Sequence, residues 1–385
     1  MILNNKIVLH IPQKAWINDT LRDIPCERLM NILTDRLQEA GFHSFYITSV
    51  TSFYNGRCYP EKLITIFCDD EYDKAAVIFC EWFTEHNDEL RQEKFAYEYN
   101  NSLCIKSAKT EHGVKKMYGA VLGDIIGSPY EFDLGDKTTD FPLFSRESQY
   151  TDDTIMTLAV AEGIMKGYKD PIKTEAEIIN SMQKWGKEYP FAGYGAMFYR
   201  WLNTPDPKPY GSFGNGSAMR VSSVGWVYDT LDEVEQYAEI SAKVTHDHPE
   251  GIKGAKAVAA AIFLARQGKS KEDIRSYIED TYGYSFSRTC DDIRPTYHHV
   301  ETCQETVPEA MTAFFEGGSF EEVIRLAVSL GGDCDTLTAI AGSIAEAFYP
   351  VPEELMKKAD DMLDAPLKKI LSDFCNFLQT KSDNY

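Results

Sequence analysis

Two long apolar segments each begin with a short run of acidic and hydroxyl residues, and this arrangement constrains the fold more than any other feature of the chain. Residues 151–154 (TDDT) run into the apolar segment 155–160, and residues 331–336 (GGDCDT) run into the apolar segment 337–344. A helix that is apolar nearly all round must be covered by other protein. We therefore expect two buried helices whose acidic starts form the two halves of one site.

Capping is the simpler interpretation of each acidic run. A carboxylate in the first turn of a helix is favoured by the helix dipole and by the unpaired backbone N–H groups. For TDDT alone, capping is the better interpretation, because such short strings recur by chance. Capping accounts for one or two acids at each start, but it does not account for both helices being apolar nearly all round. Four acids at two buried helix starts need cations. Carboxylate and hydroxyl oxygens without nearby Cys or His clusters suit Mg2+ or Mn2+ better than Zn2+.

The composition is that of a globular protein with an acidic surface. The 385 residues carry a net charge of -21 and 43% of them are hydrophobic, and the length corresponds to about two to three domains. The negative charge argues against nucleic acid as a partner. Nine cysteines without a Cys-x-x-Cys pair indicate reduced thiols. With no secretory segment and no apolar run of about 18 residues, we expect a cytoplasmic protein without a membrane span.

Residues 1–109 are predicted to form a separate small α/β (α+β) domain. The expected strands lie at 6–11, 45–50, 63–67 and 102–105, and the expected helices at 26–40 and 72–97. The order β-α-β-β-α-β is consistent with these elements, and the same elements also fit other small two-layer folds. No pattern in this domain points to chemistry. We expect it to dock a protein partner or another copy of the chain, with residues 106–113 as a linker.

The rest of the chain is predicted to be helical throughout. In its first expected helix, 117–126, and directly after it, Gly119, Gly123 and Gly127 recur at a spacing of four residues. One face of this helix is therefore bare backbone, and a second helix can approach it closely. This spacing indicates a closely packed helix pair in the core.

Three loop features carry further candidate site residues. Glu131 follows the glycine-spaced helix, and taken alone it is best interpreted as a solvated loop acid. Residues 210–220 hold three glycines within six residues, so backbone N–H groups can face a phosphate or a ribose oxygen, although most such segments are simply turns. His246 and His248 could bind a metal ion, but the acid-rich site makes a capping or substrate-contacting role the better interpretation.

Together these motifs resemble the ADP-ribosylglycohydrolase family. They are GDIIGSPYE, YTDDT, GSFGNGSAMR, THDHPEG and GGDCDT, in this order, and the resemblance covers residues 114–378. It implies a mainly α protein, in which residues 114–385 form a catalytic all-α orthogonal helical bundle with a binuclear Mg2+ or Mn2+ centre. The metal ligands that it implies are Thr151, Asp152, Asp153, Asp333, Asp335 and Thr336. The ADP-ribose contacts that it implies are Gly214, Asn215, Gly216, Ser217 and His246.

The resemblance also implies a function, which is removal of ADP-ribose from a modified protein side chain. Arginine is the preferred acceptor, with serine and other linkages as alternatives. Asp153 or Asp335 would activate the water, and Glu131 would reach or gate the metal ions. An ADP-ribose-binding or antitoxin-type protein that binds a partner ADP-ribosyltransferase is the alternative. A metal-dependent phosphohydrolase would need Lys, Arg or His at the phosphorus, and none is evident beside these acids.

Overall fold

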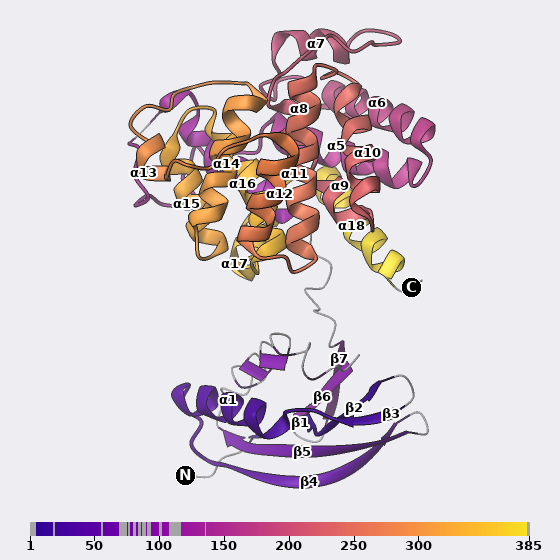
Figure 1. Cartoon of the computed structure of the whole chain (residues 1–385), viewed down its shortest axis with the longest axis vertical. Helices are drawn as coiled ribbons and strands as arrows, with labels where there is room; N and C mark the ends of the chain where they lie inside the picture. The colour runs from indigo at the N-terminus through magenta and orange to yellow at the C-terminus, as the bar shows by residue number, and fades with distance from the viewer. Residues whose placement is uncertain are drawn as a thin grey trace. The chain divides into compact units, whose positions relative to one another are not determined.

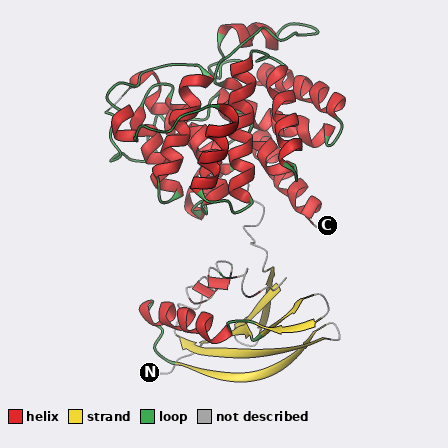
Figure 2. Cartoon of the chain, viewed as in Figure 1, coloured by secondary structure: helices red, strands yellow, loops and turns green. Residues whose placement is uncertain are grey.

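The computed structural model divides the chain into two compact units, Met1–Gly113 and Val114–Tyr385 (Figure 1). It describes residues 5–17, 20–54, 57–68, 75, 78–79, 82–83, 86, 90, 94–99, 102–107, 117–134 and 136–382. Strands occur in the first unit and helices dominate the second (Figure 2). The prediction of a mainly α chain with a small α/β part at its N-terminus is confirmed. Among the described residues, no helix is both long and apolar enough to cross a lipid bilayer.

The first unit is built on an antiparallel sheet with the strand order β4-β5-β1-β6-β7. Its strands are β1 (Asn5–Pro12), β4 (Phe45–Tyr54), β5 (Arg57–Cys68), β6 (Lys94–Tyr99) and β7 (Ser102–Ser107). A separate hairpin pairs β2 (Lys14–Ile17) with β3 (Thr20–Asp23). Helix α1 (Cys26–Glu39) buries Leu29, Leu33 and Leu37. These leucines belong to the same core cluster as Ile7 and Ile64 of the sheet, so the helix covers one sheet face.

The structure confirms most of the elements predicted for this unit and corrects one. The strands expected at 6–11, 45–50, 63–67 and 102–105 and the helix expected at 26–40 are all present. The helix expected at 72–97 is wrong at its end, because Lys94–Tyr99 forms strand β6 between β1 and β7. The β2–β3 hairpin was not predicted. Residues 108–113 of the expected linker lie outside the described residues.

The second unit is all-α. Its helices are α4 (Tyr118–Gly127), α5 (Asp152–Gly167), α6 (Pro171–Glu188), α7 (Ala196–Leu202), α8 (Gly216–Met219), α9 (Ser222–Val227), α10 (Leu231–Lys243), α11 (Pro249–Arg266), α12 (Lys271–Tyr282), α13 (Cys290–Ile293), α14 (Cys303–Glu316), α15 (Phe320–Leu330), α16 (Cys334–Phe348), α17 (Glu353–Met362) and α18 (Ala365–Ser382), with the 3-10 turn η1 (Ser128–Asp133) directly after α4. Helix α16 lies among α11, α14 and α15 near the middle of the unit (Figure 1).

The two helices predicted to be buried, α5 and α16, are both buried along most of their length. Helix α4 packs against α16 through its glycine face. A Cβ atom at Gly123 would lie 2.3 Å from the backbone oxygen of Thr338, and one at Gly119 would lie 2.2 Å from the backbone oxygen of Gly342. Real Cβ atoms do not approach backbone so closely, so these positions require glycine. The predicted close-packed helix pair is therefore α4 with α16.

Candidate active site

The start of α5 is held by Asp124, a fully buried carboxylate in α4. Asp124 accepts hydrogen bonds from the backbone N–H and the hydroxyl of Thr151, both at 2.8 Å, and from the backbone N–H of Thr154 at 3.0 Å. The Thr151 side chain in turn accepts from the backbone N–H of Asp153 at 3.3 Å. Thr151 and Asp124 therefore satisfy the first N–H groups of α5. The capping interpretation of Asp152 and Asp153 fails, since other oxygens cap the helix.

The start of α16 is shaped by two glycines with positive φ. Gly331 and Gly332 adopt φ values of 74° and 78°, which side chains rarely tolerate, and they turn the chain into the helix. Asp333 is the N-cap residue, but its side chain makes no capping hydrogen bond. Instead it accepts from the side-chain amide of Asn215 at 2.6 Å. Its carboxylate therefore takes part in the site and does not cap its own helix.

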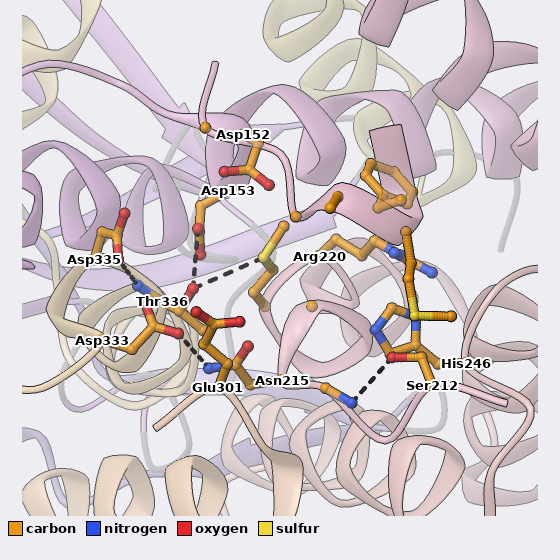
Figure 3. Close-up of a pocket in the computed structure, with 18 of the residues that line it drawn as sticks. Asp152, Asp153, Ser212, Asn215, Arg220, His246, Glu301, Asp333, Asp335 and Thr336 are labelled. Carbon is orange, nitrogen blue, oxygen red and sulfur yellow. Dashed lines mark hydrogen bonds between the residues drawn. The ribbon is translucent and has the colours of Figure 1, made fainter. Parts of the chain in front are cut away.

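A direct hydrogen bond joins the two helix starts. The hydroxyl of Thr336 donates to Oδ2 of Asp153 at 3.0 Å (Figure 3). The other oxygen of that carboxylate, Oδ1, is buried and has no hydrogen-bond partner in the part of the chain that the structure describes. A buried carboxylate oxygen without a partner is costly, and a cation removes this cost. Figure 3 shows Asp152, Asp153, Asp333 and Asp335 on the same side of the pocket.

Glu131 joins this acidic group from the turn after α4. Its carboxylate and those of Asp333 and Asp335 each offer an oxygen, and these three oxygens lie within 4.8 Å of one another. The turn that carries Glu131 departs from helical geometry, and the next residue, Phe132, has a φ of 59°. This backbone conformation brings Glu131 to the site, although the residue alone had been interpreted as a solvated loop acid.

Burial and mutual repulsion raise the pKa values of these carboxyl groups. Burial, together with the charge of Asp335, raises the pKa of Asp152 and of Asp153 well above the usual value. Burial raises the pKa of Asp333 to about 6, and burial and Asp335 raise that of Glu131 to about 7. So many crowded acids cannot all ionise without positive charge nearby. A set of carboxylate and hydroxyl oxygens fits a hard divalent cation such as Mg2+ or Mn2+.

A cavity of about 370 Å3 adjoins the acids, a volume typical of a small-molecule site. Of the predicted ADP-ribose contacts, Gly214, Asn215, Gly216 and His246 line this cavity. Ser217 does not line it, because its buried hydroxyl donates to the backbone oxygen of Gly251 at 2.7 Å. Ser212, Arg220 and His246 lie at the opposite side of the pocket from the acids (Figure 3).

His248 lies apart from this cavity. It is the N-cap residue of α11, and its side chain accepts from the backbone N–H of Glu250 at 3.2 Å. Of the two roles that were preferred over metal binding, capping is therefore the one that the structure shows for His248.

Sequence reasoning missed three residues at this site. The hydrogen-bond partners of Asp124 lie 27 and 30 positions away along the chain, so no local sequence pattern indicates its role. Arg220 lines the cavity and is 1% exposed. Only its place directly after the glycine-rich turn could have indicated it. Glu301, also in the cavity wall, lies in a segment without any recognisable motif.

An all-α unit in which two helix starts bring buried acids beside a small-molecule cavity defines a protein with a ligand site suited to hard cations. The sequence profile of the ADP-ribosylglycohydrolase family matches residues 107–382. The chain therefore belongs to the ADP-ribosylglycohydrolase family, and it is an enzyme that hydrolyses ADP-ribosyl bonds.

Individual relatives agree with this assignment. The chain is 27% identical to the human protein named ADP-ribosylhydrolase ARH3, over 63% of this chain and 87% of the human one. It is 25% identical to ADP-ribosylarginine hydrolase Tri1 of Pseudomonas putida, over 63% of this chain and 72% of that protein. A solved structure titled ADP-ribosylglycohydrolase-related protein complex matches with a TM-score of 0.55 and 23% identity, over 70% of this chain and 98% of that one. This last likeness supports the fold.

Proposed function

We propose that the chain releases ADP-ribose from modified arginine side chains, by attack of water at the anomeric carbon in a site that holds two divalent cations, Mg2+ or Mn2+. The observation that carries the proposal is the hydrogen bond between Thr336 and Asp153. It joins two acidic helix starts into one site next to a cavity of suitable size. A protein that only binds ADP-ribose has no need of such a costly group of buried acids.

The residues that would hold the cations are those of the two helix starts: Thr151, Asp152, Asp153, Asp333, Asp335 and Thr336. The unpartnered Oδ1 of Asp153 supports this assignment, as does the cluster of Glu131 with Asp333 and Asp335. Bound divalent cations would orient the ribose hydroxyls and a water molecule and lower the pKa of that water.

The carboxylates would also move the protons of the reaction. Asp153 or Asp335 accepts a proton from the water as its oxygen bonds to the anomeric carbon. As that bond forms, the bond from the same carbon to the guanidino nitrogen breaks through an oxocarbenium-like state, and the nitrogen takes up a proton from solvent in place of the one that the water gives up. The products are ADP-ribose and an unmodified arginine. Glu131 lies close enough to Asp335 to approach the same centre.

The other end of the cavity would hold the diphosphate. Gly214 and Gly216 expose backbone without side-chain bulk there, and His246 lies beside both. Backbone amides and a neutral imidazole can donate hydrogen bonds to phosphate oxygens. This arrangement suits a protein with a strongly acidic surface, since it needs few exposed cationic side chains.

Arginine as the acceptor is favoured by the charge of the cavity. Glu131 and Glu301 both line it. Carboxylates in the cavity wall suit a cationic guanidinium better than a neutral serine hydroxyl. The relative from Pseudomonas putida is named as an ADP-ribosylarginine hydrolase, which agrees with this preference.

The test is a comparison of ADP-ribosylated arginine and serine peptides with and without Mg2+. We expect metal-dependent release of free ADP-ribose, faster from arginine, and loss of release in Asp335→Ala. Asp361→Ala, which removes an exposed acid far along the chain, is the matched control and should retain activity. Release from serine alone would overturn the preferred linkage. No release from any linkage by metal-loaded protein would overturn the hydrolase mechanism and favour a binding role.

A further inference from the structure

Arg220 is a buried cation in the wall of the cavity. The side chain is 1% exposed, and within the described part of the chain no Asp or Glu forms an ion pair with it. One terminal nitrogen donates to the backbone oxygen of Ser241 at 3.2 Å and to the hydroxyl of Thr245 at 2.7 Å. Its Nε is buried without a hydrogen-bond partner. Because burying a charge is costly, this arginine requires an explanation beyond packing.

Thr245 links this arginine to His246. The Thr245 hydroxyl lies 2.6 Å from Nδ1 of His246, and both residues are buried. An arginine only donates hydrogen bonds, so the hydroxyl oxygen must accept from Arg220. The hydroxyl hydrogen then needs an acceptor of its own. No other partner of this hydroxyl occurs among the described residues, so Nδ1 is the acceptor that satisfies the hydroxyl hydrogen.

This arrangement determines which nitrogen of His246 carries the hydrogen. If Nδ1 accepts from Thr245, a neutral imidazole must carry its hydrogen on Nε2. Nε2 faces the glycine-rich turn: Cβ atoms built at Gly214 and Gly216 would each lie 3.4 Å from it. The side chain lies next to Arg220 and Ser212 in the wall of the cavity (Figure 3). A hydrogen on Nε2 therefore points to where a ligand would lie.

We propose that Arg220, acting through Thr245, is a positioning residue that fixes His246 in the tautomer with its hydrogen on Nε2, so that the imidazole donates to an oxygen of the ADP-ribosyl group. The identity of the ligand oxygen rests on the proposed function, whereas the tautomer does not. Burial and the nearby charge of Arg220 also lower the pKa of His246 well below its usual value. The ring therefore stays neutral. Without the relay, which is the chain of hydrogen bonds from Arg220 through Thr245 to His246, a neutral ring could carry its hydrogen on Nδ1. Nε2 would then be an acceptor and would repel a phosphate oxygen.

The direct test is the tautomer of His246 in the full chain. With histidine labelled in 15N, a long-range nitrogen–proton spectrum distinguishes a protonated Nε2 from a protonated Nδ1, and His246→Gln identifies the signals. We expect the hydrogen on Nε2 in the wild type. A hydrogen on Nδ1 would overturn the inference, whether or not the protein hydrolyses any substrate.

Variants of the relay test its consequence. In Arg220→Met the Thr245 hydroxyl no longer has to accept from the guanidinium and is free to accept from Nδ1, so we expect His246 to shift towards the Nδ1–H tautomer. The KM for an ADP-ribosylated peptide should rise about tenfold, as expected for one lost hydrogen bond, with a much smaller change in kcat. Arg220→Lys keeps the charge and a donor, so its KM should lie close to the wild-type value.

A second pair of variants tests the relay independently, in case the arginine variants do not fold. Thr245→Val removes the hydroxyl at nearly constant volume, and Thr245→Ser keeps it. We expect the serine variant to retain the wild-type histidine spectrum and the valine variant to lose it. Equal spectra and equal KM values in the two variants would overturn the relay. If the tautomer is as expected but no linkage is hydrolysed, the proposed function fails and the role of Arg220 stands.

Discussion

The hydroxyl of Thr336 donates a hydrogen bond to Asp153 across 3.0 Å, although 183 positions of the chain separate the two residues. This bond connects the first turn of α16 to the first turn of α5. Neither helix start is complete as a site alone, because each supplies only part of the acidic group. The fold of the second unit therefore serves to bring two helix N-termini together with their carboxylates facing one another.

The crowded acids make the metal-free protein less stable than it could be. Asp335 raises the pKa of both Asp152 and Asp153 through its charge and is itself buried. In Asp335→Asn one repelling charge is absent, so we expect the free energy of unfolding without metal to rise by about 1–2 kcal/mol. Thermal unfolding in the presence of a chelator measures this change.

The same variant should respond less to metal. Mg2+ or Mn2+ should raise the melting temperature of the wild type in a concentration-dependent way, because a ligand that binds only the folded state stabilises it. We expect the shift to be lost in Asp335→Asn and kept in Asp361→Asn, which alters an exposed acid. A wild-type melting temperature that changes with neither Mg2+ nor Mn2+ would contradict the cation site.

Asp124 should matter although it does not line the cavity. It receives three hydrogen bonds from Thr151 and Thr154. The amide oxygen of an asparagine can keep the two backbone N–H groups, but its NH2 group would face the Thr151 hydroxyl, which would have to accept instead of donate, so Asp124→Asn should cost about 1 kcal/mol of stability. Because Thr151 also caps α5, we expect the variant to need more metal for half-maximal thermal stabilisation. The exposed Asp140→Asn serves as control, and equal behaviour of the two variants would contradict this role.

The glycine face of α4 gives a prediction about packing. Gly123→Ala should destabilise the second unit by at least about 2 kcal/mol, because the new methyl group would meet the backbone of α16 at 2.3 Å. Gly195→Ala is the matched control, since no atom lies within 4 Å of a Cβ there. Its cost should stay below about 1 kcal/mol. Chemical unfolding followed by circular dichroism compares the two, and similar losses would argue against close helix packing.

Much of the second unit could be predicted from the sequence because its signals are local. The runs TDDT and GGDCDT precede helices that are apolar all round, and the four-residue glycine spacing marks the α4 face. The capping box that Ser270 and Asp273 form at the start of α12 is another local signal that is visible in the sequence.

What could not be predicted depends on contacts between distant residues. The role of Asp124 arises only when α4 lies against the start of α5. The polar relay of Arg220 and Thr245 connects α8 to the loop after α10. In the first unit, Lys94–Tyr99 became a strand because β1 and β7 pair with it, and such pairing overrides the local helical tendency. Long-range pairing thus limits sequence reasoning most in the small sheet.

His10 gives the first unit a pH-dependent ion pair. Its ring nitrogens lie 3.0 Å from Glu61 and 3.3 Å from Glu98. Burial opposes protonation of this histidine, but the two carboxylates outweigh burial and raise its pKa above 6.5. The folded unit therefore binds more protons than the unfolded chain above pH 6.5. The stability that this pair contributes should be complete below pH 6.5 and lost as pH rises through the raised pKa.

The expected contribution is small, at most about 1 kcal/mol, because the group is partly exposed to solvent. Hydrogen exchange of the β1 amides at pH 6 and pH 8, corrected for intrinsic exchange rates, measures it in the full chain. We expect protection to be greater at pH 6 in the wild type and equal at both values in His10→Gln. His43→Gln, an exposed histidine in the same unit, should behave like the wild type. Protection that increases with pH would contradict the charged pair, since the sign of the effect follows directly from the raised pKa.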